Sequence, residues 1–237
     1  MAVPAQGREV TLERIRPAKS LAETAAAQIR DAILSGAFRL GENISEDRLV
    51  ERLGVSRTPV RDAMALLARE GLVVVRPKRG SFVFQTSPED IKAICDYREL
   101  LETQGVRVAL RVARHPYLDE LASVVTAMED ALARDDADTY GRLDTQFHNA
   151  AFTHCGNSYL RDANTLVAGR IAALRANITA PYAERRAESM AEHVTMTRLL
   201  ADGDLEAFDA ALNIHIRRTE DVYSRALVDG HLGAHRG

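Results

Sequence analysis

Residues 54–71 read GVSRTPVRDAMALLAREG, and this stretch decides the organisation of the amino-terminal part of the chain. Gly-Val-Ser predicts a turn before a new helix, with Ser56 or Thr58 available as cap and Pro59 in the first turn, where a missing N–H is tolerated. Apolar residues recur at helical spacing on one face, namely Val60, Met64, Leu67 and Ala68. Arg57 and Arg61 crowd the start of the helix. The pattern is typical of a recognition helix that packs one face on a core and presents cations from its amino-terminal end.

The flanking segments complete a helix-turn-helix with a wing. Ser45 predicts the start of a short helix that Gly54 ends, which leaves only a tight turn before the basic helix. Residues 72–75 and 81–84 are predicted to be strands, joined by the basic stretch RPKRG at residues 76–80. The tip of such a hairpin can contact a phosphate backbone or a minor groove.

The run LVERLGVSRTPVRDAMALLAREGLVVVRPKRGSFV at residues 49–83 resembles the winged helix-turn-helix of the GntR family of bacterial transcription regulators. The resemblance implies that double-stranded operator DNA is the partner. Asp47 stands where some relatives carry an arginine, and Arg48 lies beside it. We expect a homodimer on an inverted repeat, because helix-turn-helix proteins commonly read two-fold operators. The expected DNA-binding residues are Arg48, Arg57, Thr58, Arg61, Lys78, Arg79 and Gly80.

Composition indicates two domains. At 237 residues, 46% hydrophobic and 27% charged, the chain can bury a substantial core. Residues 1–86 hold 14 Lys and Arg against 10 Asp and Glu, whereas residues 87–237 hold 17 against 24. The basic part contains the predicted recognition helix, so we expect a DNA-binding domain at 1–86 and a second domain at 87–237.

The chain shows no signal for export or membrane insertion. Its amino terminus lacks the apolar core of a targeting signal, and no later stretch has the apolar length needed to cross a bilayer. Cys95 and Cys155 fall inside helical patterns and are predicted to be reduced, packed thiols. We therefore expect a cytoplasmic protein without a membrane partner.

Beyond the wing only helices are predicted. Ser87-Pro88 supplies a cap and a first-turn proline, strand-like alternation is absent, and short connections favour antiparallel neighbours. The expected fold class is mainly α: a winged helix-turn-helix followed by an all-helical bundle of six to seven helices. The predicted helices cover about residues 88–114, 117–134, 137–155, 158–177, 184–202 and 204–228, after a first helix that a capping box of Ser20 and Glu23 begins.

Polar residues fall on the apolar stripes of three bundle helices. Asp144 and His148 lie four residues apart on one inward face, and His193 and His215 lie among apolar neighbours on two other helices. Burying these four groups unpaired is costly, which indicates a divalent transition metal held by all four. Imidazole and carboxylate ligands suit zinc first, with nickel, manganese or iron as alternatives. A hydrogen-bonded core without metal is the other interpretation.

The spacing of these ligands resembles the FCD effector domain of the FadR-type branch of the GntR family. That resemblance implies that an Asp and three His hold a metal, that a small carboxylic acid binds beside it, and that an arginine on the domain's first helix clamps the acid. Arg98 matches this arginine. It also lies on an inward helical face, so its guanidinium needs a partner, which is either an effector carboxylate or Glu102 at i,i+4. Asn164 and Arg170 on a later helix are further candidates for the pocket.

The sequence thus predicts a ligand-responsive transcription regulator, a repressor, without catalytic residues. A metal-dependent enzyme is the first alternative, because Asp and His ligands could activate water. No further acid or nucleophile shows the spacing of a general base, since Glu192 is rotated about 100° from His193 on a helix. A regulator whose metal is purely structural is the second alternative.

Overall fold

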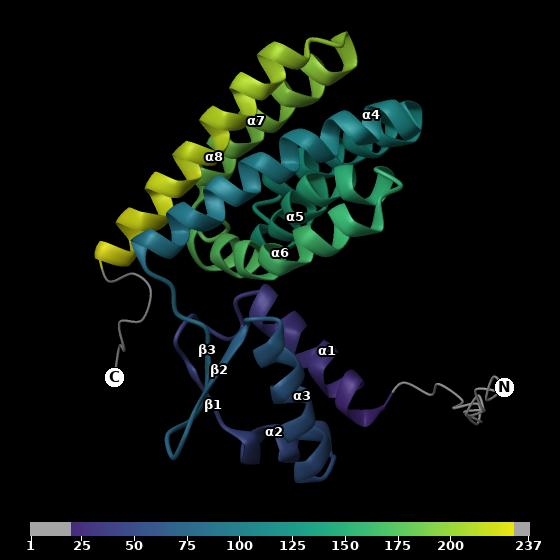
Figure 1. Cartoon of the computed structure of the whole chain (residues 1–237). Helices are drawn as coiled ribbons and strands as arrows, with labels where there is room; N and C mark the ends of the chain where they lie inside the picture. Colours follow the sequence, from purple (N-terminus) through teal and green to yellow (C-terminus); the bar gives the residue numbers. More distant parts are fainter. Residues whose placement is uncertain (1–19, 230–237) are drawn as a thin grey trace, which may run out of the picture.

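A computed structural model describes residues 20–229, which form a winged helix-turn-helix followed by a helical bundle (Figure 1). The amino-terminal elements are α1 (Leu21–Leu34), β1 (Asn43–Ile44), α2 (Glu46–Leu53), α3 (Arg57–Arg69), β2 (Val73–Arg76) and β3 (Gly80–Val83). The bundle contains α4 (Pro88–Ala133), α5 (Ala137–His154), α6 (Ser158–Ile178), α7 (Ala183–Asp202) and α8 (Leu205–Val228). The mainly α fold class is confirmed.

Local sequence signals begin and end the helices of the winged part. Ser20 and Glu23 form the reciprocal capping box at α1, and Ser45 accepts from the backbone N–H of Arg48 at α2. Gly54 ends α2 with φ 64°, a left-handed conformation that glycine adopts without steric cost. Ser56 is the cap residue of α3, although its side chain makes no capping hydrogen bond.

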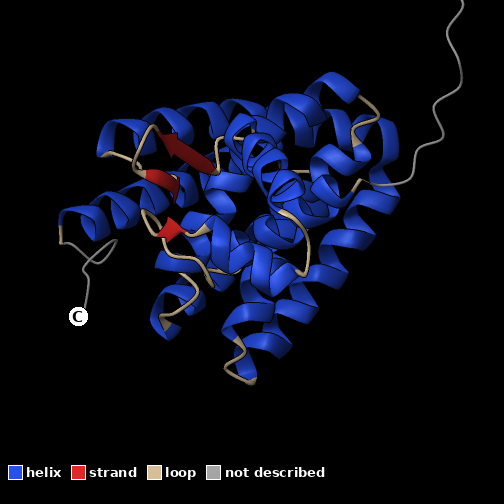
Figure 2. Ribbon diagram, turned by 90° about the horizontal axis from the view of Figure 1, so that it is seen from below, coloured by secondary structure: helices blue, strands red, loops and turns tan. Residues whose placement is uncertain are grey.

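The wing is part of a three-stranded antiparallel sheet with the order β1-β3-β2 (Figure 2). Strand β1 has only two residues, too few to show an alternating pattern, and the sequence did not predict it. Gly80 adopts φ 101°, and a Cβ atom there would lie 3.1 Å from the side chain of Asn43. Glycine is therefore required at the base of the wing turn.

The α4 span consists of two helices that meet at the break that Pro116 predicts. It bends at Ala113, whose φ of −146° and ψ of 49° are not helical. Pro116 lacks an N–H and its ring crowds the preceding turn, which explains a kink at this place. The two helices expected at 88–114 and 117–134 are therefore present within α4, and both pack along α5: Glu102 contacts His148, whereas Glu120 contacts His154 and Gln146.

The other bundle helices begin at predicted breaks. Asp136, Asn157 and Asp204 each accept a backbone N–H of the first turn of α5, α6 and α8. Cys95 and Cys155 are free and buried, as predicted. Within residues 20–229 no helix is long and apolar enough to cross a membrane.

Helix α6 packs against the winged part, and Figure 1 shows it on the side of the bundle that faces α1. Arg170 Nε donates to the carbonyl oxygen of Gly71 at 3.1 Å, directly beyond the recognition helix α3. The Arg170 guanidinium also lies 5.6 Å from the ring centre of Phe84. Arg170 therefore contacts the winged part. It does not line the cavities at the histidine cluster, so the prediction that it reaches the effector pocket is wrong.

Candidate metal centre and DNA-binding surface

Three histidines from three helices meet inside the bundle. His148 of α5, His193 of α7 and His215 of α8 are 8%, 0% and 2% exposed. Their ring centres are 5.0–5.1 Å apart, and one nitrogen from each ring lies within 4.8 Å of the others. The packing of three helices thus assembles a set of imidazole ligands suited to a transition metal.

Asp144 lies at the edge of this cluster. Its Oδ1 is 3.5 Å from His148 Nε2 and 2.5 Å from Arg175 Nε, although the latter pair is not aligned as a hydrogen bond. Within the described chain, Oδ1 of Asp144 and Nδ1 of His193 are buried without a hydrogen-bond partner. The Arg175 charge compensates Asp144 Oδ1, whereas His193 has one ring nitrogen without a partner and the other 3.2 Å from His148 Nε2, an arrangement of converging imidazoles that fits a cation. Asp144 is turned toward Arg175 here, and its role as a ligand stays a prediction.

Glu192 and Arg218 orient His215. Glu192 Oε2 lies 2.7 Å from His215 Nδ1, and Arg218 holds the Glu192 carboxylate with two contacts of 2.7 Å. Burial opposes ionisation of Glu192, but the hydrogen bonds from His215 and Arg218 prevail and lower its pKa to about 2. An ionised Glu192 accepts the Nδ1–H of His215, which leaves Nε2 as the lone-pair donor for a metal. The sequence missed this role because Glu192 reaches across to the neighbouring helix.

The environment keeps the three imidazoles neutral. Burial lowers the pKa of His148 and His193 well below 6.5, and the positive charge of nearby arginines lowers both further. Burial also lowers the pKa of His215, with Glu192 opposing the shift. Neutral imidazole is the form that coordinates a metal.

Arg98 is paired internally. It is 2% exposed and forms a short ion pair with Glu102, and its Nη2 lies 2.9 Å from each ring nitrogen of His148. Glu102 Oε2 in turn lies 2.9 Å from His148 Nδ1. Of the two partners considered for Arg98, the structure contains Glu102, immediately beside the histidine cluster.

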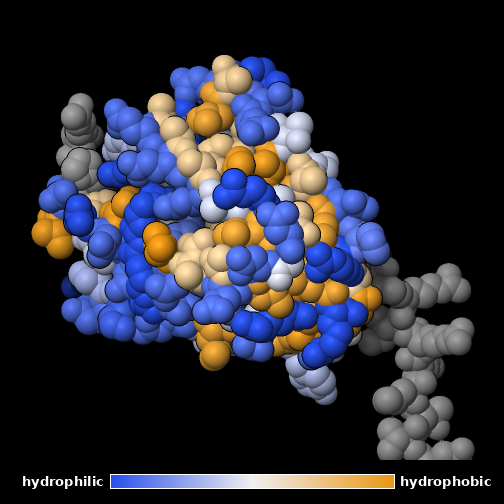
Figure 3. Space-filling model, turned by 90° about the horizontal axis from the view of Figure 1, so that it is seen from above, coloured by the Kyte–Doolittle hydropathy of each residue, from blue (hydrophilic) through white to orange (hydrophobic). Residues whose placement is uncertain are grey.

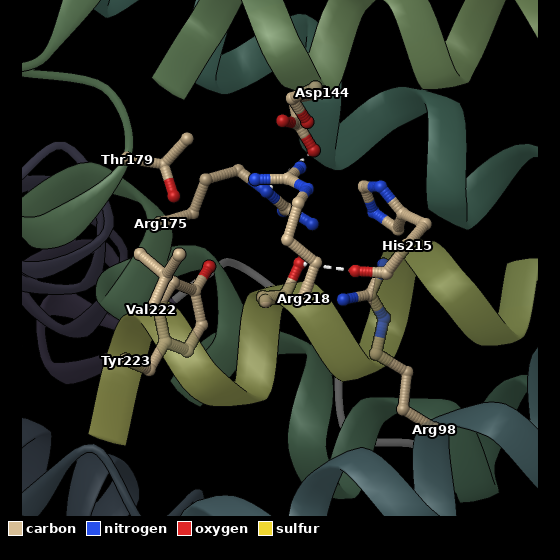
Figure 4. Close-up of a pocket in the computed structure, with 10 residues that line it drawn as sticks. Arg98, Asp144, Arg175, Thr179, His215, Arg218, Val222 and Tyr223 are labelled. Atoms are coloured by element: carbon tan, nitrogen blue, oxygen red, sulfur yellow. Dashed lines mark hydrogen bonds and ion pairs between the residues drawn. The ribbon is translucent and has the colours of Figure 1, made fainter. Parts of the chain in front are cut away.

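Two small cavities of about 10 Å³ each flank the cluster, and Arg98 and Arg175 line both. Figure 4 shows the cavity that Asp144 and His215 also line, with the arginine side chains reaching in from different helices. The other cavity includes Asn164, whose Nδ2 donates to Asn149 Oδ1 at 2.9 Å. Asn164 therefore lies where the sequence predicts, and its contact with an effector stays a prediction.

Arg175 is a site residue that the sequence reasoning missed. It is 4% exposed on α6, pairs with Asp144, and donates from Nη1 to Thr145 Oγ1 at 2.8 Å. A signal was available, because Arg175 falls on the apolar stripe between Ile171 and Ile178. The same argument had singled out Arg98.

The predicted DNA-binding residues gather at the start of α3, in α2 and in the wing. Arg57 pairs with Asp47 at 2.8 Å and Arg61 with Glu46 at 3.2 Å, yet their side chains are 62% and 67% exposed. Exposed pairs of this kind contribute little to stability, so both guanidinium groups can exchange their carboxylate for DNA. The remaining candidates, also exposed, are Arg48, Thr58, Lys78, Arg79 and Gly80.

Comparison with known proteins identifies a family for each of the two parts of the chain. Residues 21–83 match the family of bacterial regulatory proteins of the gntR type, and residues 93–218 match the FCD domain. The chain belongs to the GntR family. The two matched segments lie on either side of the predicted boundary after residue 86, which itself stays a prediction. The matched families are regulatory proteins, so the enzyme alternative is set aside.

Individual relatives of this GntR protein are also regulators. It is 29% identical over 150 residues to a gluconate operon transcriptional repressor of Bacillus subtilis, a match that spans 61% of each chain. It is 29% identical over 208 residues to an uncharacterized HTH-type transcriptional regulator of Streptomyces ambofaciens, covering 84% of this chain and 83% of the relative. A solved GntR structure from Rhodococcus sp. RHA1 superposes with a TM-score of 0.74 at 25% identity, over 91% of this chain and 99% of that one.

Proposed function

We propose that this protein is a homodimeric repressor whose affinity for an inverted-repeat DNA operator is controlled by a small carboxylic acid bound next to a metal. Asp144, His148, His193 and His215 are the proposed metal ligands, with zinc as first choice. The observation that carries the proposal is the convergence of three buried imidazoles beside a buried arginine, in a domain separate from the recognition helix. The repressor named in Bacillus supports the sign of regulation.

The DNA side of the proposal rests on α3 and the wing. An exposed arginine at the start of a recognition helix can make a bidentate contact to guanine in the major groove, and Arg57 and Arg61 occupy that position. Lys78 and Arg79 at the wing tip suit phosphate, which fixes the orientation of the protein on the duplex. Binding to DNA would break the ion pairs that Arg57 and Arg61 make with Asp47 and Glu46.

The sensor side rests on Arg98. The buried Arg98 guanidinium contacts the Glu102 carboxylate and the His148 ring. It can bind an incoming carboxylate only if Glu102 moves away. A bound metal attracts the same incoming carboxylate. The proposed ligand therefore displaces Glu102 from Arg98 and also binds the metal. Glu102 pairs with Arg98 when no acid is bound.

Helix α6 supplies a route between the two sites. Asn164 and Arg175 line the cavities at the cluster, whereas Arg170 on the same helix donates to Gly71 beyond the recognition helix. A ligand that draws Arg175 away from Asp144 would shift α6 relative to α3. Coupling of this kind requires that the ligand bind the two arrangements with different affinity.

Dimer formation has support on the bundle. Leu100 of α4 and Ile214 of α8 are both 63% exposed. Figure 3 shows apolar side chains among charged ones on the bundle face turned away from the winged part. Burial of such residues between two copies would place two recognition helices on one operator. A bacterial operator as partner also places the proposed action in the cytoplasm.

The test is a fluorescence anisotropy titration of the metal-loaded protein on DNA from the region upstream of its own gene, repeated with a panel of organic acids. We expect saturable binding that at least one acid weakens. The Arg57→Ala, Arg61→Ala double variant is the negative control for DNA binding. If the protein binds the operator and no acid alters the affinity, the metal is structural and the sensor proposal is wrong.

A further inference from the structure

The charged groups around the histidine cluster balance one another. Arg98 is paired with Glu102, Arg175 with Asp144, and Arg218 with Glu192. These are the arginine and carboxylate side chains that line the two cavities, together with the carboxylate that Arg218 holds. Arg218 also contacts Glu188 at 3.4 Å, but that side chain is 61% exposed and its charge is largely screened by water. Because the three histidines are neutral, three positive charges beside the cluster face three negative ones.

A divalent cation would disturb this balance. If His148, His193, His215 and Asp144 hold the metal, Asp144 must turn toward it and away from Arg175. Among residues 20–229, Arg175 then keeps the hydroxyl of Thr145 as its one side-chain hydrogen-bond partner, although the residue is 4% exposed. The loaded site carries an excess of two positive charges in a buried environment, which is strongly unfavourable without a counter-ion.

We infer that the sensor site takes a dicarboxylate rather than a monocarboxylate, with Arg175 as its second anchor beside Arg98. The inference rests on the proposed function and deepens it by naming the ligand class. A monocarboxylate leaves one uncompensated charge in the loaded site, whereas a dianion restores neutrality. We assign one carboxylate to each guanidinium, since Arg98 on α4 and Arg175 on α6 each already hold a separate carboxylate, Glu102 and Asp144.

The cavities support a two-point ligand. Arg98 and Arg175 line both the cavity with His215 and the cavity with His148, so each arginine can serve a ligand on either side of the cluster. Each cavity has a volume of about 10 Å³, room for about one water molecule. Room for a four- or five-carbon acid therefore requires the arginines to leave Glu102 and Asp144, and the metal and the ligand promote both displacements.

The test compares matched acids by isothermal titration calorimetry on the full-length, zinc-loaded protein. Succinate is compared with butyrate and glutarate with valerate, which differ only in the second carboxylate, and sulfate serves as a compact dianion. We expect the dicarboxylates to bind about tenfold to a hundredfold more tightly than their partners, the range of a hydrogen-bonded charged pair. The preference should disappear in chelated protein, whose site is already neutral.

Variants locate the second anchor. Arg175→Gln should abolish the preference for dicarboxylates, Arg175→Lys should retain part of it, and Arg161→Gln, an exposed position on the same helix, should leave it unchanged. A preference that survives in Arg175→Gln overturns the role of this residue. The comparison of matched acids on the wild-type protein tests the dicarboxylate preference even if a variant fails to fold.

The outcomes also separate this inference from the proposed function. Equal or tighter binding of the monocarboxylates, or sulfate binding as tight as succinate, overturns the dicarboxylate inference. The proposed function survives that result if a monocarboxylate changes operator affinity. If no acid binds and none changes operator affinity, both fail.

Discussion

Removal of the metal should lower the thermal stability of the bundle by an amount that can be worked out. The proposed ligands lie on α5, α7 and α8, so the metal joins three helices and its binding energy adds to the free energy of unfolding. Free metal at about 100 to 1,000 times its Kd contributes about 2.7 to 4.1 kcal/mol. For a chain of this size each kcal/mol moves Tm by about 2–4 °C, so chelation should lower Tm by roughly 5–16 °C.

Differential scanning calorimetry with zinc or with chelator measures this shift, and elemental analysis measures bound metal. His193→Ala should abolish the zinc-dependent shift, and any intrinsic cost of the substitution cancels because each variant is its own reference. His154→Ala is the matched control, since His154 lies outside the cluster and bonds to Glu120 at 2.7 Å. Substoichiometric metal in protein purified without chelator, with no stabilisation by zinc, nickel or manganese, would refute the metal site.

Four further outcomes are expected. Arg57→Ala or Arg61→Ala should each cost about 1–3 kcal/mol of specific DNA binding in an anisotropy titration, and unchanged operator affinity would contradict the assignment. Lys78→Ala should weaken binding to all sequences alike and reduce the salt dependence by about one unit of slope. Arg98→Ala should remove the effector response while Glu102→Gln, which removes the internal competitor, should tighten effector binding in calorimetry. Acid should destabilise the bundle and then release the metal: burial lowers the pKa of the cluster histidines, so the unfolded chain binds protons first and stability falls as pH drops below about 6.5, whereas metal content, followed by elemental analysis, should decline only at lower pH, where the folded imidazoles titrate or the bundle unfolds.

Local sequence signals were sufficient for the helices and for most of the inward-facing residues that the argument used. Caps such as Ser45 and Ser87 and the left-handed Gly54 act within a few residues of the chain, so helix starts and ends could be predicted. Helical periodicity likewise placed His148, which the structure buries. Strand β1 was not predicted because it forms only by pairing with β3, some 40 residues away in the chain.

What the sequence by itself determined was therefore which faces are buried and which polar groups they carry. The tertiary structure alone decided their partners. Arg175 meets Asp144, Glu192 holds His215, and Arg170 reaches Gly71 only because helices far apart in the chain pack at a particular rotation and separation. Periodicity defines the direction of a side chain about its own helix axis and contains no information on the neighbouring helix. The charge balance of the sensor site, and with it the inferred ligand class, belongs to the packed bundle for that reason.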